Sequence, residues 1–364
     1  MNKVKIGTFI SIYDIRNTRR KDYPVIGINR DKEFMPTVAN LEGVDISKYK
    51  VVTKGTFVFS GMQTGRDICI RIGLYDQDTP ALVSPAYTTF TIDKGIIIPE
   101  YFFIFFNREE SDRYGWFISD SSVRANLDWP RFLDIEIPLP SPEEQQKVVN
   151  VWKACREIKE QNEAKAAPLM QLCQSYIQEL KHKYPAQEIG PYLQFFREKN
   201  KDKEISLEQG INISKEFITP QRSNSDLSSR IKVRTGQFAY CTQLNNENVA
   251  IAYRTGPDCV VSPVYEVFEI KKESRDKLLP EYLFIWLSRP EFGRYVYWSS
   301  VGSAYEFLRF DNLYTYKIAF PPLDVQRAIV NIYKCANEAK QIAAEADRLS
   351  REVCPALLQH VIHS

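Results

Sequence analysis

Short apolar runs separated by turn-forming residues fill the first 138 positions of the chain. Val51–Ser60, Ile68–Leu74 and Tyr87–Ile92 are rich in β-branched and aromatic residues, and turn sequences such as Thr-Lys-Gly and Asp-Lys-Gly lie between such runs. This pattern predicts short strands joined by hairpins. Pro99 and Pro280 each precede a glutamate and an apolar stretch, which is typical of proline at the first position of a helix. The globular parts are therefore predicted to be mixed α/β.

The pattern becomes helical after Pro142. The residues from there to Lys183 contain no glycine, a single further proline at 168, and many Glu, Lys, Gln and Ala residues. They predict one long helix of about 60 Å. Asp324–His363 predicts its partner. Pro168 is expected to kink or locally interrupt the first helix, and Pro355 to interrupt the second near its end.

Apolar residues recur at spacings of three and four along both predicted helices. Val148, Trp152 and Cys155 are examples in the first, and Ala339 and Ala343 in the second. A stripe of this kind favours packing against another helix, and alanines permit a close approach. We expect the two helices to pair antiparallel, the alternative being that each lies on its own globular domain.

The chain consists of one pattern written twice. VSPAY at 83–87 returns as VSPVY at 261–265, GINRDKEF from Gly27 as GINISKEF from Gly210, and PEYFFIFF from Pro99 as PEYLFIWL from Pro280. The order is conserved along nearly the whole chain, which predicts an internal duplication with copies of 1–183 and 184–364. The predicted domains are a globular domain at 1–138, a long helix at 139–183, a second globular domain at 184–319 and a second long helix at 320–364.

The VSPAY and VSPVY stretches resemble the Asn/Asp-Pro-Pro-Tyr/Phe loop with which amino-methyltransferases hold a base. A methyltransferase also needs a glycine-rich turn for its cofactor, and the sequence has neither a GxGxxG nor a GxxxxGK[ST] motif. We therefore interpret both stretches as a turn followed by a strand, with Tyr87 and Tyr265 packing or positioning the chain. No catalytic residue and no cofactor are expected.

Charge and cysteine content narrow the class of protein further. Lys and Arg number 48 and Asp and Glu 46, so the net charge of +2 gives no general attraction to nucleic acid, and any basic surface must be local. The seven cysteines form no CxxC pair and the three histidines lie near helix ends, which disfavours a zinc site and fits a reducing cytosol. The N-terminus lacks a secretory pattern, and the apolar stretch GIIIPEYFFIFF is too short for a membrane span. A cytoplasmic location is expected.

The order of these segments resembles the specificity subunit of a type I DNA restriction-modification system. The resemblance rests on IPLPSPEEQQKVV at 137–149, IAFPPLDVQRAIV at 318–330, SKYKVVTKGTFVFS at 47–60 and the two VSPxY stretches. In the second copy Val325 stands where the first has Glu144. The glycine that the family commonly has before its arginine-rich loop is absent near Ser121.

The resemblance implies an α+β protein without catalysis. Two duplicated target recognition domains would each read one half of a bipartite double-stranded DNA target, and the two helices would form an antiparallel coiled coil with pseudo-twofold symmetry. It implies two methyltransferase subunits docked on the helices, with restriction translocase subunits as further candidate partners. The alternative is an interaction scaffold that does not bind DNA, which the near-zero net charge favours slightly.

Base edges are read by Arg or Lys at guanine and by Asn or Gln at adenine. Polar loops of the first copy supply the candidates Arg16, Arg19, Arg20, Gln63, Arg66, Arg124 and Asn126. Loops of the second supply Lys199, Lys201, Gln221, Arg222, Asn224, Gln243, Asn245, Asn246 and Asn248. The alternative for each is a solvated side chain. By resemblance, the candidates for partner binding are Glu144, Gln145 and Gln326, and the glutamate and glutamine of the first copy are also suited to capping or positioning the helix start.

Aromatic residues cluster beside a basic residue after each short apolar helix. They are Tyr114, Trp116, Tyr295, Tyr297 and Trp298, next to Arg113 and Arg294. Such a combination can stack on bases. An aromatic cluster after a buried helix is more often part of the core, and this is what we expect here, as we do for PEYFFIFF.

Overall fold

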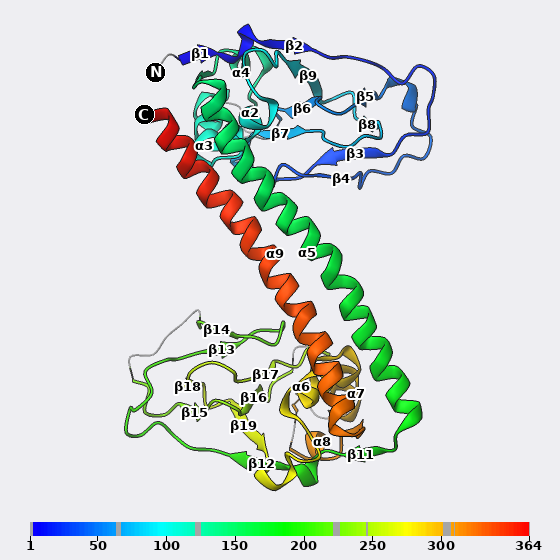
Figure 1. Ribbon diagram of the computed structural model, residues 1–364, viewed down its shortest axis with the longest axis vertical. Coiled ribbons are helices and arrows are strands. Elements are labelled where there is room, and N and C mark those ends of the chain that lie inside the picture. Colours follow the sequence, from blue (N-terminus) through cyan, green and yellow to red (C-terminus); the bar gives the residue numbers. More distant parts are fainter. Residues whose placement is uncertain are drawn as a thin grey trace. The chain divides into compact units, whose positions relative to one another are not determined.

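A computed structural model describes residues 3–62, 67–120, 125–220, 226–244, 247–300, 307–308 and 310–363. Contacts divide the chain into two compact units, residues 1–162 with 342–364 and residues 163–341. Each unit therefore contains one globular part and half of each long helix. Element labels follow Figure 1. No helix in the described part of the chain is long and apolar enough to cross a membrane.

Unit 1 is built on two four-stranded sheets and a two-stranded ribbon. The first sheet has the order β2 (Ile10–Ile12), β9 (Thr88–Ile92), β6 (Phe57–Ser60), β7 (Arg71–Leu74). The second has the order β4 (Phe34–Pro36), β3 (Val25–Ile28), β8 (Ala81–Val83), β5 (Lys50–Val52), and the ribbon pairs β1 (Lys3–Lys5) with β10 (Glu136–Pro138). Its helices are η1 (Ile6–Thr8), η2 (Ile46–Lys48), α2 (Pro99–Phe106), α3 (Glu109–Ile118) and α4 (Trp129–Leu133).

Unit 2 repeats the strand order of the first sheet and of the ribbon, as the sequence repeat predicts, whereas the strands that correspond to the second sheet form two separate pairs. Its main sheet runs β12 (Leu193–Phe196), β19 (Tyr265–Ile270), β16 (Phe238–Cys241), β17 (Ile251–Tyr253). The smaller pairs are β15 (Ile231–Val233) with β18 (Cys259–Val261), β13 (Gly210–Ile211) with β14 (Phe217–Ile218), and β11 (Ala186–Glu188) with β20 (Lys317–Ala319). Its helices are η3 (Gly190–Tyr192), η4 (Lys272–Ser274), α6 (Pro280–Ser288), α7 (Pro290–Ser300) and α8 (Phe310–Tyr314).

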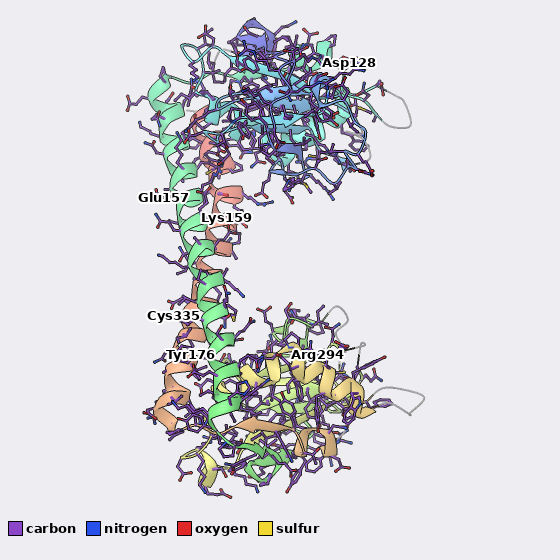
Figure 2. The ribbon with its side chains drawn as sticks, turned by 90° about the vertical axis from the view of Figure 1, so that its right-hand side faces the viewer. Asp128, Glu157, Lys159, Tyr176, Arg294 and Cys335 are labelled. Atoms are coloured by element: carbon purple, nitrogen blue, oxygen red, sulfur yellow. The ribbon has the colours of Figure 1, made fainter. Side chains whose placement is uncertain are left out.

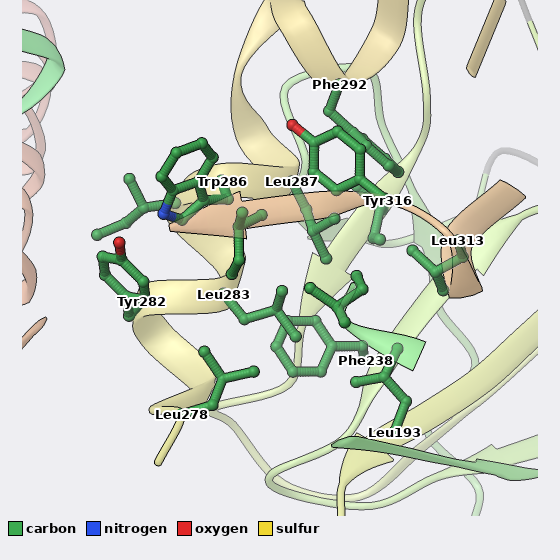
Figure 3. Packing of buried hydrophobic residues seen from close by; sticks show 14 of the residues in the cluster. Leu193, Phe238, Leu278, Tyr282, Leu283, Trp286, Leu287, Phe292, Leu313 and Tyr316 are labelled. Atoms are coloured by element: carbon green, nitrogen blue, oxygen red, sulfur yellow. The ribbon is translucent and has the colours of Figure 1, made fainter. Parts of the chain in front are cut away.

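The core of each unit forms between the main sheet and its first short helix. All six residues from Tyr101 to Phe106 in α2 are buried, which confirms the core prediction for this stretch. In unit 2 the α6 side chains Tyr282, Leu283 and Trp286 lie in one cluster with Phe238 of the sheet (Figure 3). Phe238 also stacks on Phe268 across the sheet, with ring centroids 4.8 Å apart. Aromatic pairs of this kind add to the stability that apolar burial gives.

Both VSPxY stretches form a turn that leads into a strand of the main sheet. The Tyr87 N–H donates to the Ser84 carbonyl, and the Tyr265 N–H to the Ser262 carbonyl. The Tyr265 hydroxyl accepts a hydrogen bond from the Ile211 N–H at 3.2 Å. Tyr265 therefore positions the chain and Tyr87 packs against the cluster of Ile28 and Val83, in agreement with the packing or positioning roles interpreted from the sequence.

The long helices are α5 (Pro142–Lys183) and α9 (Leu323–His363). Val148 and Trp152 of α5 share the unit 1 core with Cys354 and Leu358 of α9. In unit 2, by contrast, the end of α5 shares a core with the beginning of α9, as Ile177 and Ile329 show. Within each unit the two helices thus run antiparallel, as expected (Figure 1).

Both internal prolines lie inside uninterrupted helices. Pro168 is within α5 and Pro355 within α9, so the predicted interruptions do not occur. A proline removes its own N–H from the helical ladder, and its ring crowds the carbonyl four residues earlier, so a continuous helix needs support from packing. Residues adjoining Pro355 are held by packing, because Cys354 and Leu358 are buried in the unit 1 core.

Candidate nucleic-acid interface

A buried asparagine shapes the first basic loop of unit 1. The Asn17 amide nitrogen donates to the Lys21 carbonyl at 3.0 Å, and its amide oxygen accepts from the Lys21 N–H at 2.9 Å. Arg20 adopts a φ of 47°, a left-handed conformation that the bracketed turn imposes. The loop therefore turns its side chains outward, and Arg16, Arg19 and Arg20 are exposed.

Two of these three arginines are held by their own unit. Arg16 donates to the Lys48 carbonyl at 2.8 Å and to an Asp14 carboxylate oxygen at 2.9 Å. Arg20 lies 3.7 Å from the Asp45 carboxylate in an exposed ion pair. Exposed pairs of this kind contribute little to stability, so Arg20 remains available for a phosphate. Their role in reading bases stays a prediction.

The equivalent loop of unit 2 has the same geometry but a different charge pattern. The Asn200 side chain forms hydrogen bonds with both the carbonyl and the N–H of Ile205, as Asn17 does with Lys21. Lys203, in the position of Arg20, has a φ of 55°. The buried ammonium of Lys232 binds three carboxylates that follow β12, at 2.8 Å from Glu204, 2.9 Å from Asp202 and 3.1 Å from Glu198. These contacts raise the pKa of Lys232 above its usual value.

The loop also carries lysines that face solvent. Lys199 and Lys201, both candidates for DNA contact, are exposed. The Asp202 and Glu204 side chains are 58% and 55% exposed although both bind Lys232, so the loop presents paired carboxylates beside its exposed lysines.

In each unit a backbone hydrogen bond connects two further loops that contain candidate residues for DNA contact. In unit 1 the Leu127 N–H donates to the Gly61 carbonyl at 2.9 Å, which brings the loop after β6 against the loop after α3. A side chain at Gly61 would collide with the Leu127 carbonyl at 1.7 Å, so the glycine serves this close approach. In unit 2 the Leu308 N–H donates to the Thr242 carbonyl at 2.8 Å in the same way.

Three of the candidates in these loops lie within the described residues. Asn126 closes the unit 1 loop, since its N–H donates to Asp120 and its carbonyl accepts from the Asp120 N–H. Gln243 and Asn248 are exposed in unit 2. The other candidates, Gln63, Arg66, Arg124, Gln221, Arg222, Asn224, Asn245 and Asn246, lie outside the described residues.

The candidates for partner binding organise the start of each long helix, and for the partly exposed Glu144 a contact with a partner stays a prediction. Glu144 accepts hydrogen bonds from the Ser141 N–H and hydroxyl, while the Ser141 hydroxyl accepts from the Glu144 N–H. This is a capping box, which satisfies N–H groups at a helix start. Gln145 and Gln326 are 1% and 0% exposed. Their side chains therefore face the interior of their own units and present no surface to a partner.

Each buried glutamine joins its long helix to the backbone before the first short helix. The Gln145 oxygen accepts from the Ile98 N–H at 2.8 Å, and its nitrogen donates to the Pro140 carbonyl at 3.0 Å. Gln326 accepts from the Leu279 N–H at 2.9 Å and donates to the Lys277 and Pro321 carbonyls at 2.7 and 2.9 Å.

Replacing either glutamine by methionine is expected to destabilise its unit by about 1–3 kcal/mol, because a backbone N–H is then buried without an acceptor. Q326M should cost at least as much as Q145M, since Gln326 also serves two carbonyls. Urea unfolding of the full chain measures the effect. Methionine preserves the side-chain volume, so a loss below about 0.5 kcal/mol in both variants would contradict the assigned role.

The expected core cluster of aromatic residues in α3 and α7 forms only in part. Tyr295 packs against the unit 2 core and Tyr297 is half-buried, whereas Tyr114, Trp116 and Trp298 are exposed. Trp116 is half exposed, and Trp298 is 74% exposed. Phe117, which the sequence analysis did not single out, is 82% exposed. These helices bury the opposite face, which contains Gly115 in α3 and Phe292 and Val296 in α7.

Comparison with solved structures relates the chain to type I restriction-modification proteins. The crystal structure of a type I restriction-modification system S subunit from M. genitalium matches 99% of this chain and 95% of its own, with a TM-score of 0.63 and 12% identity. This match shows that the two proteins share a fold. An HsdS subunit from Thermoanaerobacter tengcongensis gives a TM-score of 0.37 at 15% identity, covering 100% of this chain and 94% of its own. That superposition is too loose to add to the argument. No family model and no curated protein matches the sequence.

Proposed function

We propose that this protein is the specificity subunit of a type I restriction-modification complex, reading a bipartite DNA target with one half-site for each unit. The observation that carries the proposal is the repetition of one strand order, with the same pair of joined polar loops, in a chain that has the fold of an S subunit. A reader that occurs twice in one chain suits a target with two half-sites. Such a subunit works on cellular DNA, in keeping with the expected cytoplasmic location.

The two half-sites should differ in sequence. The loop at Arg16–Lys21 offers arginines, whereas its counterpart at Lys199–Glu204 offers lysines and ties its acidic residues to Lys232. Arginine reads guanine by two hydrogen bonds, which a lysine ammonium does not reproduce with the same geometry. Because the two loops have the same backbone geometry but different side chains, we expect the two half-sites to have different sequences.

Catalysis is assigned to partner subunits. Among the described residues no group of His, Cys, Asp and Glu side chains is arranged to hold a metal ion. The exposed apolar residues of the long helices, among them Ile158, Leu172 and Tyr176 of α5, offer a docking surface for two methyltransferase subunits. Partners with basic surfaces would supply DNA affinity that a net charge of +2 does not.

The proposal is tested by producing the chain together with the methyltransferase subunit encoded beside it. A stable complex is expected, and sequencing of genomic methylation should reveal a bipartite motif that disappears when the gene for this chain is deleted. An unchanged methylation pattern, or no complex, would favour the alternative of a scaffold that does not bind DNA.

A further inference from the structure

Two large aromatic side chains project into solvent at equivalent positions of the two units. Phe117 lies in the sequence RYGWFIS of α3, and Trp298 in RYVYWSS of α7. They are 82% and 74% exposed. Scattered apolar residues on a surface need no explanation, but the same position occupied by a projecting ring in both copies of a duplicated fold does.

The way each helix packs fixes the outward direction of these rings. In α3 Gly115 is buried so closely against Ile70 that an added Cβ would lie 2.4 Å from that side chain. In α7 Phe292 and Val296 are fully buried in the unit 2 core. Residues three and four apart share one face of a helix. Phe117 and Trp298 therefore remain outside while the opposite faces are anchored.

A basic residue stands one helical turn before each ring. Arg113 precedes Phe117 by four positions, and Arg294, which is labelled in Figure 2, precedes Trp298 by four. Both arginines are exposed, and Arg113 is 3.9 Å from Glu110 in an exposed ion pair of little strength. A cation and an aromatic ring on one helix face match a nucleic acid, which offers a phosphate beside a base surface.

The helices also border the candidate DNA loops. α3 leads into the loop that Asp120 and Asn126 close with hydrogen bonds. In α7, Gly293 packs on the Gln243–Asn248 loop so closely that an added Cβ would lie 2.1 Å from the Glu247 carbonyl oxygen. Phe117 and Trp298 thus stand on helices that adjoin these loops, although Gly293 itself lies on the buried face of α7. The exposed arginine beside each ring is what favours DNA as its neighbour.

We infer that Phe117 and Trp298 are DNA contacts, each packing its ring against a base step of the half-site read by its own unit, with Arg113 or Arg294 at the adjacent phosphate. The inference rests on the proposed function and specifies residues that its loops do not include. Apolar side chains placed against a base step unstack it partly, so the bases touched are those most easily unstacked.

The test uses the complete complex with its methyltransferase subunits and a duplex containing the bipartite motif. F117A and W298A are each expected to weaken binding by about 5- to 100-fold, the range that loss of one aromatic–base contact produces. F117Y and W298F should bind like the wild type. With 2-aminopurine placed along each half-site, F117A should abolish the fluorescence change in the first half-site alone and W298A in the second alone. Each variant thus controls for the other, and I96A, at an exposed residue before α2, controls for loss of surface apolar area.

The outcomes separate the two proposals. If the wild-type complex recognises no bipartite motif, the proposed function fails, whatever the variants do. The inference is overturned if the wild-type complex recognises the motif and both alanine variants match it in affinity for the duplex and in the change of 2-aminopurine fluorescence. Loss of methyltransferase subunits from F117A or W298A, with unchanged affinity for DNA once the complex is reassembled, would assign this face to a protein partner and also overturn it. Both residues are exposed, so unchanged thermal unfolding of the variants is expected and verifies that they fold.

Discussion

K32M is expected to destabilise unit 1 by about 3–5 kcal/mol, the cost of leaving a buried charge without its partner. The Lys32 side chain is 3% exposed, and its ammonium lies 2.8 Å from the Asp112 carboxylate, which is 17% exposed. The ammonium also donates to the Phe106 carbonyl. Asp112 in turn accepts from the Ile70 N–H at 2.8 Å, so one ion pair ties the β3–β4 hairpin, α3 and the approach to β7 together.

The destabilisation should depend on pH. Burial already raises the pKa of Asp112 above its usual value, although Lys32 opposes the rise. Removing Lys32 raises the folded-state pKa further. A carboxyl whose pKa is higher in the folded than in the unfolded state binds its proton more tightly when folded, so its stabilising effect is lost as pH rises through the folded pKa. Urea unfolding should therefore show a larger loss at pH 7 than at pH 5, and K32M/D112N should recover part of it.

Lys215 provides the matched control in unit 2. It occupies the place of Lys32 in the repeat and has the same left-handed backbone, with φ 66° against 65°. Its ammonium donates to the Val249 carbonyl at 3.0 Å, and Gly293 stands where unit 1 has Asp112. Burial lowers the pKa of Lys215 to about 8. A lysine pKa lowered by folding costs stability below that pKa and costs nothing above its unfolded value.

K215M is therefore expected to be neutral or mildly stabilising at pH 7, within about 1 kcal/mol of the wild type. Since no carboxylate is left behind, the large penalty predicted for K32M has no counterpart. A loss in K215M as large as in K32M would show that hairpin packing rather than the ion pair determines both effects.

Removing Glu160–Ala166 together with Lys340–Ala346 is expected to shorten the gap between the two half-sites while leaving their sequences unchanged. The segments are matched by counting outward from the ion pair between Lys159 and Asp347, whose atoms are 2.9 Å apart (Lys159 is labelled in Figure 2). Each loses about two helical turns, roughly 10 Å, which corresponds to about three base pairs. The original motif should no longer be methylated, and a shortened motif should replace it in the methylation map.

A paired deletion of a different length serves as the control, because the number of helical turns removed decides which way the apolar stripe faces. A loss of about two whole turns returns each apolar stripe to nearly the same face, whereas a loss of about one and a half turns carries it to the opposite side. Paired deletions of the second kind should abolish the complex. Retention of the original gap after the in-phase deletion would mean that the helices do not set the spacing.

The repeat made much of the fold predictable. Strands, short helices opened by proline and the two long helices all follow from local patterns, and the strands and α-helices of the first copy recur in the second. The repeat also favoured packing or positioning roles for Tyr87 and Tyr265, which the structure confirms. What the prolines do in α5 and α9 could not be read in this way, because packing on both sides of Pro355 outweighs one missing hydrogen bond.

The candidate site was less predictable because exposure depends on tertiary contacts. Gln145 and Gln326 lie in a polar stretch that suits a surface, yet their hydrogen-bond partners come from residues about 47 positions earlier in the chain. Trp116 was expected in the core because of its aromatic neighbours, yet it is half exposed. The signal for the orientation of α3 is Gly115, which marks the face where the helix approaches Ile70.

The side chains of the two buried glutamines form hydrogen bonds only with backbone atoms of their own units. This affects how the sequence around them can change during evolution. The N–H groups come from Ile98 and Leu279, and the carbonyl groups from Pro140, Lys277 and Pro321. Every residue has a backbone carbonyl, and every residue except proline has a backbone N–H. The hydrogen bonds of each glutamine thus do not depend on the side chains of its partner residues. These hydrogen bonds would therefore survive substitution of the side chains at those positions, whereas the apolar contacts of the long helices with each core would not.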